Sequence, residues 1–280
     1  MDIKIFACYH KAAQTIRSDI IQPIHVGKAL SAADLGFPGD DTGDCISTKN
    51  THYCELTATY WIWKNVHADV VGLFHYRRLL NLANARTKTH KTDAASLSAH
   101  GLTRENIHSL LCRYDVLLPH ECSFDETIHE QYRKAHFASD IDTALAVIDE
   151  KYPHMSHAAD TVIRKSSRMY GTNMFVAPKP LFDEYARWLF DILFEVERRV
   201  HDNVHDRNDY QKRIYGFLSE RLMAVFIRYK QQADGLKFMT FPVLHVEEDE
   251  RKWNRYRFHF FGHRLLGALG LGKKRWQRQM

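Results

Sequence analysis

Short apolar runs alternate along this chain with segments whose apolar residues recur at helical spacing. The short runs predict strands at 3–8, 20–26, 70–74, 114–119, 172–177 and 238–246. Helical spacing and end signals predict helices at 53–66, 103–112, 125–136, 140–151, 181–200 and 217–231. Strands that alternate with helices are typical of a mixed, mostly parallel sheet flanked by helices. We therefore expect an α/β fold in one domain spanning residues 1–248.

Capping residues and loop composition refine these elements. Asn50 and Thr51 can cap the helix at 53–66, and Ser139 can cap the helix at 140–151. Residues 34–52 form a loop rich in Gly, Asp and Thr, and residues 83–100 are expected to form a polar surface loop.

Composition places the chain among globular proteins of a reducing compartment. Its 280 residues are 45% apolar, which supports a sizeable core. The five cysteines form no CxxC pair, which fits a cytoplasmic protein better than a disulfide framework. The sequence shows neither a signal peptide nor an apolar stretch long enough to span a membrane.

The net charge of +5 is concentrated at one end of the chain. Residues 251–280 hold nine Lys and Arg and no Asp or Glu, so the rest holds 30 basic and 34 acidic residues. A body of this charge gives no reason to expect nucleic-acid binding. The segment 249–280 interleaves basic and aromatic residues, which predicts contact with an anionic membrane surface through residues 251–280. The alternative is a helix packed on the body or a subunit contact.

The strongest candidate for chemistry follows the apolar run at 70–74. That run leads directly into His75, Tyr76, Arg77 and Arg78. Open α/β sheets bind ligands at the carboxyl ends of their strands, and two adjacent arginines suit a phosphate or diphosphate. The alternative is an edge strand that continues into a solvated basic turn.

Several common motifs are missing. No GxGxxG, P-loop, HExxH or GxSxG occurs, which argues against dinucleotide oxidoreductases, P-loop NTPases, zincins and α/β-hydrolases. No DxD pair follows an apolar strand either, although guanidinium groups can neutralise a leaving diphosphate without a metal. His201 and His205 lie four residues apart near carboxylates, but the polar composition of 201–212 favours a solvated connection over a metal site.

Six ordered motifs between residues 3 and 247 resemble one bacterial family. They are the segments at 41–50, 53–65, 72–78, 171–176, 216–222 and 242–247. In these segments the chain resembles the glycosyltransferases of capsule, exopolysaccharide and lipopolysaccharide clusters, long catalogued as a domain of unknown function. The resemblance implies a nucleotide-sugar-dependent transferase with a GT-A-like fold. Cys45 departs from the family pattern, where asparagine is expected.

The resemblance assigns donor-binding roles to residues at strand ends and in loops. They are Cys8, Tyr9 and His10 after the first strand, the loop residues Asp41, Thr42, Gly43 and Asp44, then Glu55, His75, Tyr76, Arg77, Arg78, Asn173, Arg221 and His245. For the loop the alternative is a turn with side-chain caps, and for Glu55 it is helix capping. A buried His75, Tyr76 or His245 can also simply satisfy a backbone group.

Glu220 is the expected catalytic base. A transferase that inverts the anomeric centre needs a carboxylate to take the proton of the acceptor hydroxyl. Glu220 opens a late helix, where such folds place acceptor and base, and Arg221 follows it. The alternative is a surface glutamate paired with an arginine.

The expected function is transfer of a hexose (galactose, galactofuranose or glucose) from a nucleotide diphosphate sugar, UDP-linked, to a growing surface polysaccharide or lipid-linked glycan. No cofactor is certain, and a divalent cation, Mg²⁺ or Mn²⁺, is compatible with the Asp41–Asp44 loop. The expected location is the cytoplasm, peripheral to the inner face of the cell membrane. The alternatives are a sugar-phosphate transferase and a non-catalytic scaffold of the polysaccharide machinery.

Overall fold

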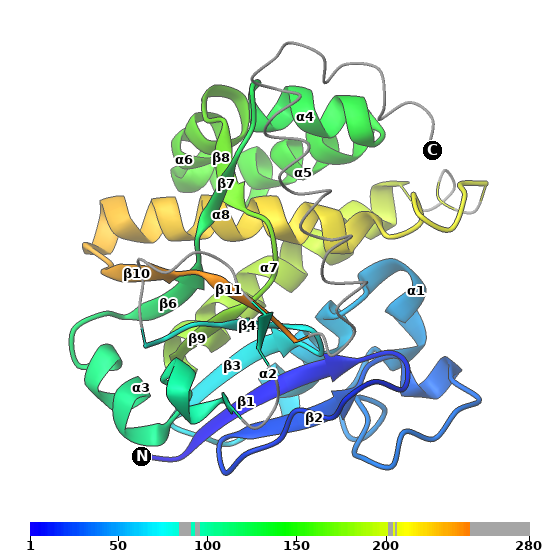
Figure 1. Ribbon diagram of the computed structural model, residues 1–280. Coiled ribbons are helices and arrows are strands. Elements are labelled where there is room, and N and C mark those ends of the chain that lie inside the picture. The colour runs from blue at the N-terminus through cyan, green and yellow to red at the C-terminus, as the bar shows by residue number, and fades with distance from the viewer. Residues whose placement is uncertain (84–90, 93–95, 201–203, 205, 247–280) are drawn as a thin grey trace, which may run out of the picture.

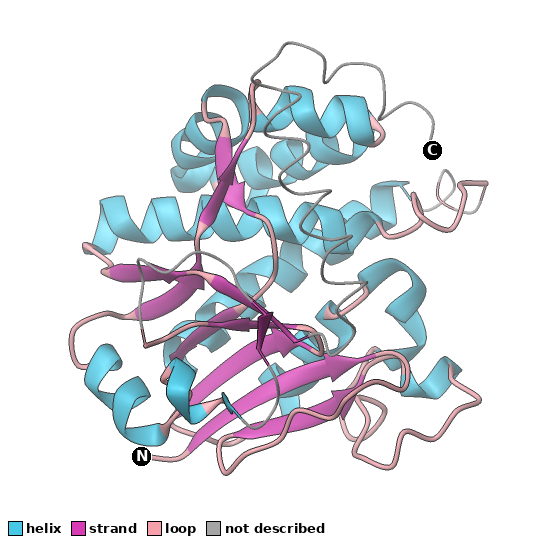
Figure 2. Ribbon diagram, viewed as in Figure 1, coloured by secondary structure: helices cyan, strands magenta, loops and turns pink. Residues whose placement is uncertain are grey.

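A computed structural model describes residues 1–83, 91–92, 96–200, 204 and 206–246 (Figure 1). Within them, a nine-stranded sheet is flanked by helices, and a separate two-stranded pair lies among the helices above it (Figure 2). The expected α/β fold is confirmed.

The central strands run in the order β2-β1-β3-β9-β6-β10. The strands are β1 Ile3–Tyr9, β2 Ile21–His25, β3 Val70–His75, β4 Arg78–Leu80, β5 Lys91–Thr92, β6 Val116–Pro119, β7 Glu121–Ser123, β8 Arg168–Tyr170, β9 Phe175–Pro178, β10 Phe238–Phe241 and β11 Val243–Val246. β1 is parallel to both β2 and β3, and β10 is parallel to β6. β9 is antiparallel between β3 and β6. A tight turn after β3 leads into β4, which continues the sheet through β11 to β5.

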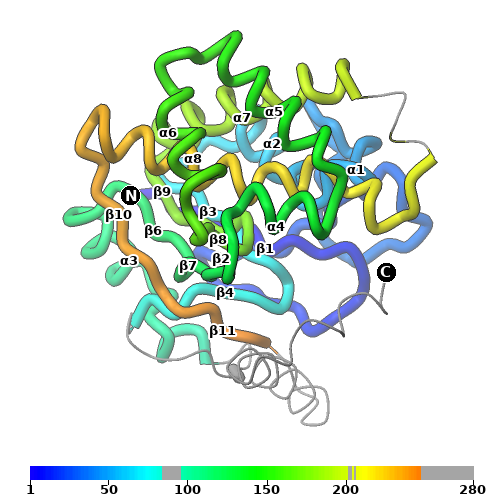
Figure 3. The backbone as a smooth tube through the Cα atoms, turned by 90° about the horizontal axis from the view of Figure 1, so that it is seen from above, coloured from blue at the N-terminus to red at the C-terminus, as the bar shows by residue number. Residues whose placement is uncertain are grey.

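Helices of very different length flank this sheet or pack on the helices that do (Figure 3). They are α1 Asn50–Tyr53, α2 Leu56–Asn65, α3 Arg104–Leu111, α4 Ile128–Ala135, α5 Ala138–Lys151, α6 Ser156–Asp160, α7 Lys179–Val200 and α8 Ile214–Asp234. Short 3-10 turns occur at Lys28–Leu30, Ser47–Lys49, Ser98–His100 and Pro153–Met155, and a π-helical turn occurs at Thr161–Lys165. No helix in these described segments is long and apolar enough to cross a membrane.

Two hydrophobic cores lie on opposite faces of the sheet. Because successive side chains of a strand point to opposite faces, Phe6 and Cys8 join the core beneath α2, α5, α7 and α8. Ile5 and Tyr9 join the other core, which α3 helps to cover. On β3 the same alternation places Leu73 in the first core. It also turns His75, two residues further on, toward that face.

Three local expectations are wrong, each for a physical reason. The helix at 53–66 is broken, because Cys54 has a positive φ of 53° that ends α1 before α2 begins. α5 begins at Ala138 without a side-chain cap, so Ser139 does not cap it. The strand at 238–246 is divided at Pro242, and its halves β10 and β11 pair with different strands, β6 and β4.

Other expectations fall on residues outside the description. These include most of the loop at 83–100, the pair His201 and His205, and the segment 249–280 with its boundary at 248. The helix expected at 103–112 is confirmed as α3, and the Thr103 side chain caps it by accepting from the Asn106 N–H.

Candidate active site

One row of residues crosses four neighbouring strands at the same level of the sheet. Cys8 of β1 pairs with His75 of β3, His75 pairs with Arg78 of β4, and Arg78 pairs with His245 of β11. β1, β3 and β11 are distant in sequence, whereas β4 follows β3 after a tight turn, and the four strands lie side by side in Figure 1. The sheet register therefore brings together Cys8, the pair His75 and Arg78, and His245, which the sequence had singled out at three separate strand ends.

Glu55 faces this row from the break between α1 and α2. Its Oε1 accepts a hydrogen bond of 2.8 Å from Asn173 Nδ2 and lies 3.8 Å from His75 Nε2. Glu55 occupies the N-cap position of α2, but its side chain makes no capping hydrogen bond. The carboxylate thus points to the site, and the capping alternative does not describe it.

Asn173 is a buried link between two parts of the site. Its amide oxygen accepts a hydrogen bond of 3.0 Å from Ser219 Oγ, while its amide nitrogen holds Glu55. Both ends of the side chain are therefore occupied within the protein, at 2% exposure. This arrangement fits a residue that positions Glu55 better than one that contacts a sugar.

The chain reversal that presents Glu55 is strained. Cys54 has φ 53° and ψ −132°, which a residue with a β-carbon rarely adopts. Arg213 Nε donates to Cys54 Sγ at 3.2 Å, and a β-carbon added at Gly216 would lie 3.2 Å from the same sulfur. Contacts from α8 and the turn before it therefore surround the reversal.

Glu220 and Arg221 enter the site from α8. Arg221 Nη1 donates to Glu220 Oε2 at 2.9 Å, and Arg221 Nη2 donates to Gln131 Oε1 at 2.8 Å. Burial raises the pKa of Glu220 to about 7, with a further upward contribution from Glu55, although Arg221, Arg78 and Arg213 oppose it. The Glu220 side chain is 23% exposed, so it is arginine-paired but not a surface residue.

The histidines of the site are held neutral at neutral pH. Burial lowers the pKa of His75 despite the opposing effect of Glu55, and nearby Arg78 and Arg213 lower it further. Burial, Lys11 and two nearby arginines lower the pKa of His10, and burial with Arg78 and Arg77 lowers that of His245 to about 4. His75 Nε2 is buried without a hydrogen-bond partner, so it is a polar atom available to a ligand.

Tyr9 and Tyr76 lie on the opposite face of the sheet, in the second core. The Tyr9 hydroxyl donates to the carbonyl of Gln14 and accepts from the N–H of Ile16, so its bonds fix the segment after β1. The Tyr76 ring packs on Tyr9 and His10, with the Arg77 guanidinium 5.0 Å from its centre. These positions are those of supporting residues.

The loop Asp41–Asp44 is tied to α2. Thr42 Oγ1 accepts from Trp61 Nε1, and Asp44 Oδ1 accepts from the Tyr60 hydroxyl, both at 3.0 Å. Gly43 has a positive φ of 61°, where an added β-carbon would also collide with the Asn65 side chain.

Asp41 offers the one loop carboxylate oxygen that is buried without a hydrogen-bond partner in the described part of the chain. The described residues hold no group of three or more His, Cys, Asp or Glu side chains suited to a metal ion.

Sequence reasoning missed several residues of this site. Arg213 follows a polar loop and carried no signal, and Cys54 lay in a recognised motif but within an expected helix, so nothing indicated a chain reversal there. Ser219 was inside a recognised motif, but its bond to Asn173 joins positions 46 residues apart.

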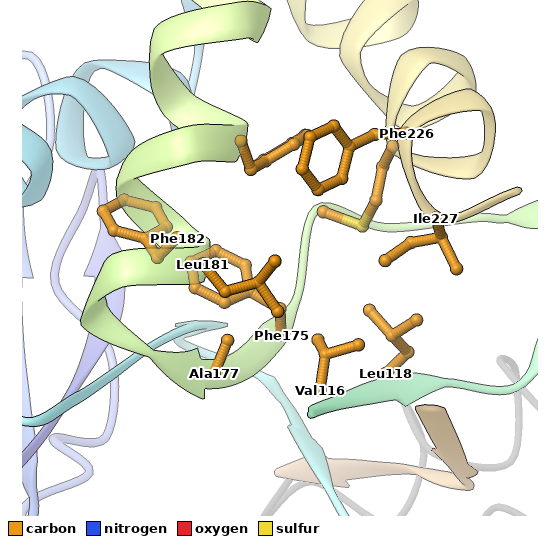
Figure 4. Close-up of a pocket in the computed structure, with 10 residues that line it drawn as sticks. Val116, Leu118, Phe175, Ala177, Leu181, Phe182, Phe226 and Ile227 are labelled. Atoms are coloured by element: carbon orange, nitrogen blue, oxygen red, sulfur yellow. The ribbon is translucent and has the colours of Figure 1, made fainter. Parts of the chain in front are cut away.

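An apolar pocket lies between the sheet and the long helices (Figure 4). Its walls include Val116, Phe175, Phe182, Phe226 and Ile227. This lining is nonpolar and offers no charged group to a phosphate, so the pocket is not the candidate site.

Comparisons with known proteins agree with this fold. Residues 4–232 match the family described as "Domain of unknown function (DUF4422)". The chain is also similar to the apo structure of the WbbM bifunctional glycosyltransferase, at 36% identity with a TM-score of 0.83. The match covers 89% of this chain and 46% of that one, so the chain spans about half the length of that protein. No curated protein matches the chain.

Proposed function

The chain belongs to the DUF4422 family of domains, and from that premise we propose that it is a glycosyltransferase that uses a nucleotide diphosphate sugar. The similarity to a bifunctional glycosyltransferase supports glycosyl transfer, and we extend the proposal to a GT-A-like use of the sheet. In this arrangement the donor lies across the carboxyl ends of β1 and β3, next to His10 and Arg78.

The observation that carries the proposal is the position of Arg78 between His75 and His245, opposite two carboxylates. Departure of a nucleoside diphosphate leaves negative charge on its phosphate oxygens. Guanidinium groups placed beside those oxygens stabilise that charge. Arg77 and Arg213 are close enough to lower the pKa of His10, so they add positive charge to the same region.

Glu220 supplies the base in the proposed reaction. The acceptor hydroxyl loses its proton to the Glu220 carboxylate while its oxygen bonds to the anomeric carbon. The bond from that carbon to the diphosphate breaks, and the electron pair leaves with the diphosphate. A pKa of about 7 suits this role, because the carboxylate is substantially ionised near neutral pH and still accepts a proton readily.

A divalent cation would find few protein ligands in this region. Asp41 and Asp44 are the acidic residues of the loop, and Asp41 has a buried carboxylate oxygen without a partner. Mg²⁺ commonly takes one or two carboxylates and completes its shell with phosphate and water. We propose that any Mg²⁺ or Mn²⁺ binds in this manner, with the arginines neutralising the rest of the charge.

The finer assignments rest on family resemblance. We propose UDP-linked galactose, galactofuranose or glucose as donor, and a surface polysaccharide or lipid-linked glycan as acceptor. We also propose a cytoplasmic enzyme that contacts the inner membrane face through residues 251–280, whose sequence is basic and aromatic. Liposome sedimentation with and without these residues tests that contact; equal sedimentation would contradict it.

Calorimetry with UDP tests the central proposal. We expect the unmodified protein to bind UDP and the double variant Arg77→Ala, Arg78→Ala to lose this binding. Arg198→Ala is the matched control, since Arg198 lies on α7 in an exposed ion pair with Glu195. Absence of nucleotide binding by the unmodified protein would contradict the proposal and leave the scaffold alternative.

A donor screen with and without EDTA identifies the sugar and the role of metal. Release of UDP from a hexose donor supports glycosyl transfer. If the phosphate attached to the sugar is labelled and the label appears in the acceptor product, the protein is instead a sugar-phosphate transferase.

A further inference from the structure

An aromatic cluster lies beside the site, and none of its residues has been assigned to donor binding. It consists of His136 at the end of α4, Tyr210 in the turn before α8, and Phe217 in the first turns of α8. The His136 and Phe217 rings stack at 4.1 Å between centres, and the Tyr210 ring lies 5.1 Å from Phe217. Tyr210 is 51% exposed and is one of four large hydrophobic side chains that the described residues leave exposed.

The exposed tyrosine is held by a rigid turn. Gln211 Nε2 donates to the carbonyl of Ala135, and Gln211 Oε1 accepts from His136 Nδ1. The Gln211 N–H donates to Asn208 Oδ1, and the Arg213 N–H donates to the carbonyl of Tyr210. An exposed ring on such a fixed turn loses little conformational entropy when a ligand covers it.

The cluster adjoins the proposed catalytic groups. Phe217 precedes Glu220 by three residues on α8, so the two side chains lie one turn apart on the same side of the helix. The Phe217 ring is also near Arg213, whose guanidinium lies 5.6 Å from the ring centre. The same guanidinium donates to the sulfur of Cys54, the residue before Glu55. Figure 1 shows the start of α8 beside α1, the helix that ends just before the break with Glu55.

The chemistry of the cluster suits a neutral ring with one apolar face. Burial lowers the pKa of His136 to about 4, so its imidazole is uncharged at neutral pH and stacks as an aromatic ring. A hexopyranose presents C–H groups on one face and hydroxyls around its edge. Aromatic faces carry partial negative charge, which favours such C–H groups and leaves the hydroxyls to water or to Glu220.

We propose that Tyr210, backed by Phe217 and His136, is the stacking platform for the acceptor sugar. This inference rests on the proposed function, because it takes Glu220 as the base that the acceptor hydroxyl must reach. A hexopyranose stacked on Tyr210 directs a ring hydroxyl along α8 toward Glu220, with the donor on the far side against Arg78. The ligand class is a neutral hexose unit of a glycan.

Saturation-transfer NMR with methyl galactopyranoside and methyl glucopyranoside, with saturating UDP and without nucleotide, tests the platform. We expect saturation of the C–H protons on one sugar face in the unmodified protein and in Tyr210→Phe, which keeps the ring. Tyr210→Leu keeps apolar area without a ring, and we expect about tenfold weaker glycoside binding from it. Leu30→Ala is the control, since Leu30 is 55% exposed and lies on a separate turn.

The outcomes separate this inference from the proposed function. Equal glycoside binding by Tyr210→Leu and the unmodified protein overturns the platform. The platform is also overturned if the unmodified protein binds neither of the two glycosides. Weaker binding of Tyr210→Leu to anionic phosphatidylglycerol vesicles, with glycoside binding unchanged, overturns it in favour of a membrane contact. Failure to bind UDP contradicts the donor site alone, because glycoside binding is also measured without nucleotide.

Discussion

Replacing Glu220 with glutamine tests the proposed base directly. Glutamine keeps the shape of the side chain and still accepts from Arg221, but it cannot take a proton from an acceptor hydroxyl. General base catalysis contributes about 10²- to 10⁴-fold, so we expect kcat to fall by that factor. UDP affinity should change by less than about twofold, since the arginines that bind the diphosphate are untouched.

The raised pKa adds a signature in pH. Because the pKa of Glu220 is about 7, the ionised base becomes more abundant as the pH rises through neutrality. The kcat of the unmodified enzyme should therefore rise from about pH 6 to about pH 8. The residual activity of Glu220→Gln should lack this rise.

The free energy of unfolding should fall with rising pH, whereas kcat rises. The ordinary pKa of a glutamate is 4.5, and that of Glu220 in the folded protein is about 7. Between these two pH values the folded protein keeps a proton on Glu220 that the unfolded chain releases. The free energy of unfolding therefore falls as the pH rises through this window. The full difference between the two pKa values corresponds to about 3 kcal/mol of unfolding free energy. The partial exposure of Glu220 reduces this contribution to about 1–3 kcal/mol. The free energy of unfolding of Glu220→Gln, relative to that of the unmodified protein, should thus be higher at about pH 8 than at about pH 5, by about 1–3 kcal/mol.

Urea unfolding at both pH values and a pH profile of kcat measure these effects. Glu184→Gln is the matched control, because Glu184 is 51% exposed and pairs with Lys230 on the surface. Its stability relative to the unmodified protein should change with pH by less than about 0.5 kcal/mol. A kcat for Glu220→Gln within about twofold of the unmodified enzyme would refute the assignment of the base.

Three further substitutions test the supports of the site and fold. Asn173→Asp places a second carboxylate against Glu55, so urea unfolding should show a greater loss of stability at about pH 8 than at about pH 5. Arg207→Ala leaves the buried Asp140 charge unpaired and should cost about 3–5 kcal/mol of unfolding free energy, whereas Arg207→Met with Asp140→Leu should cost less. Gly72→Ala would bring a β-carbon to 2.9 Å from the Phe175 carbonyl, and the thermal midpoint should fall by an amount equivalent to about 1–3 kcal/mol.

The periodic elements were predictable because their signals are local. The stripe of apolar residues expected at 181–200 corresponds to α7, Lys179–Val200, and the apolar run at 70–74 corresponds to β3. The polar groups at the ends of β1 and β3 were also visible, since each directly follows an apolar run. Strand alternation carries further information, because Tyr9 and Cys8 must face opposite sides of the sheet.

The assembly of the site was not predictable, because it depends on long-range register. Pairing of Arg78 with both His75 and His245 requires the chain to divide at Pro242 and return β11 beside β4. The bond from Asn173 to Glu55 spans 118 residues. The reversal at Cys54 interrupts a helical pattern, and tertiary contacts from Arg213 and Gly216 offset its backbone strain.

The site separates donor binding from proton abstraction by the kind of group that performs each. Arg78 is flanked by His75 and His245, whose pKa values burial and the arginines lower, so these imidazoles add hydrogen-bonding atoms without added charge. The positive charge at the diphosphate therefore comes from guanidinium groups, which keep their protons throughout the physiological range. Glu220 of α8, with a pKa of about 7, changes charge near neutrality. Donor affinity should thus be almost constant across neutral pH while turnover changes, because the protein assigns binding to arginine and proton transfer to a partly buried carboxylate.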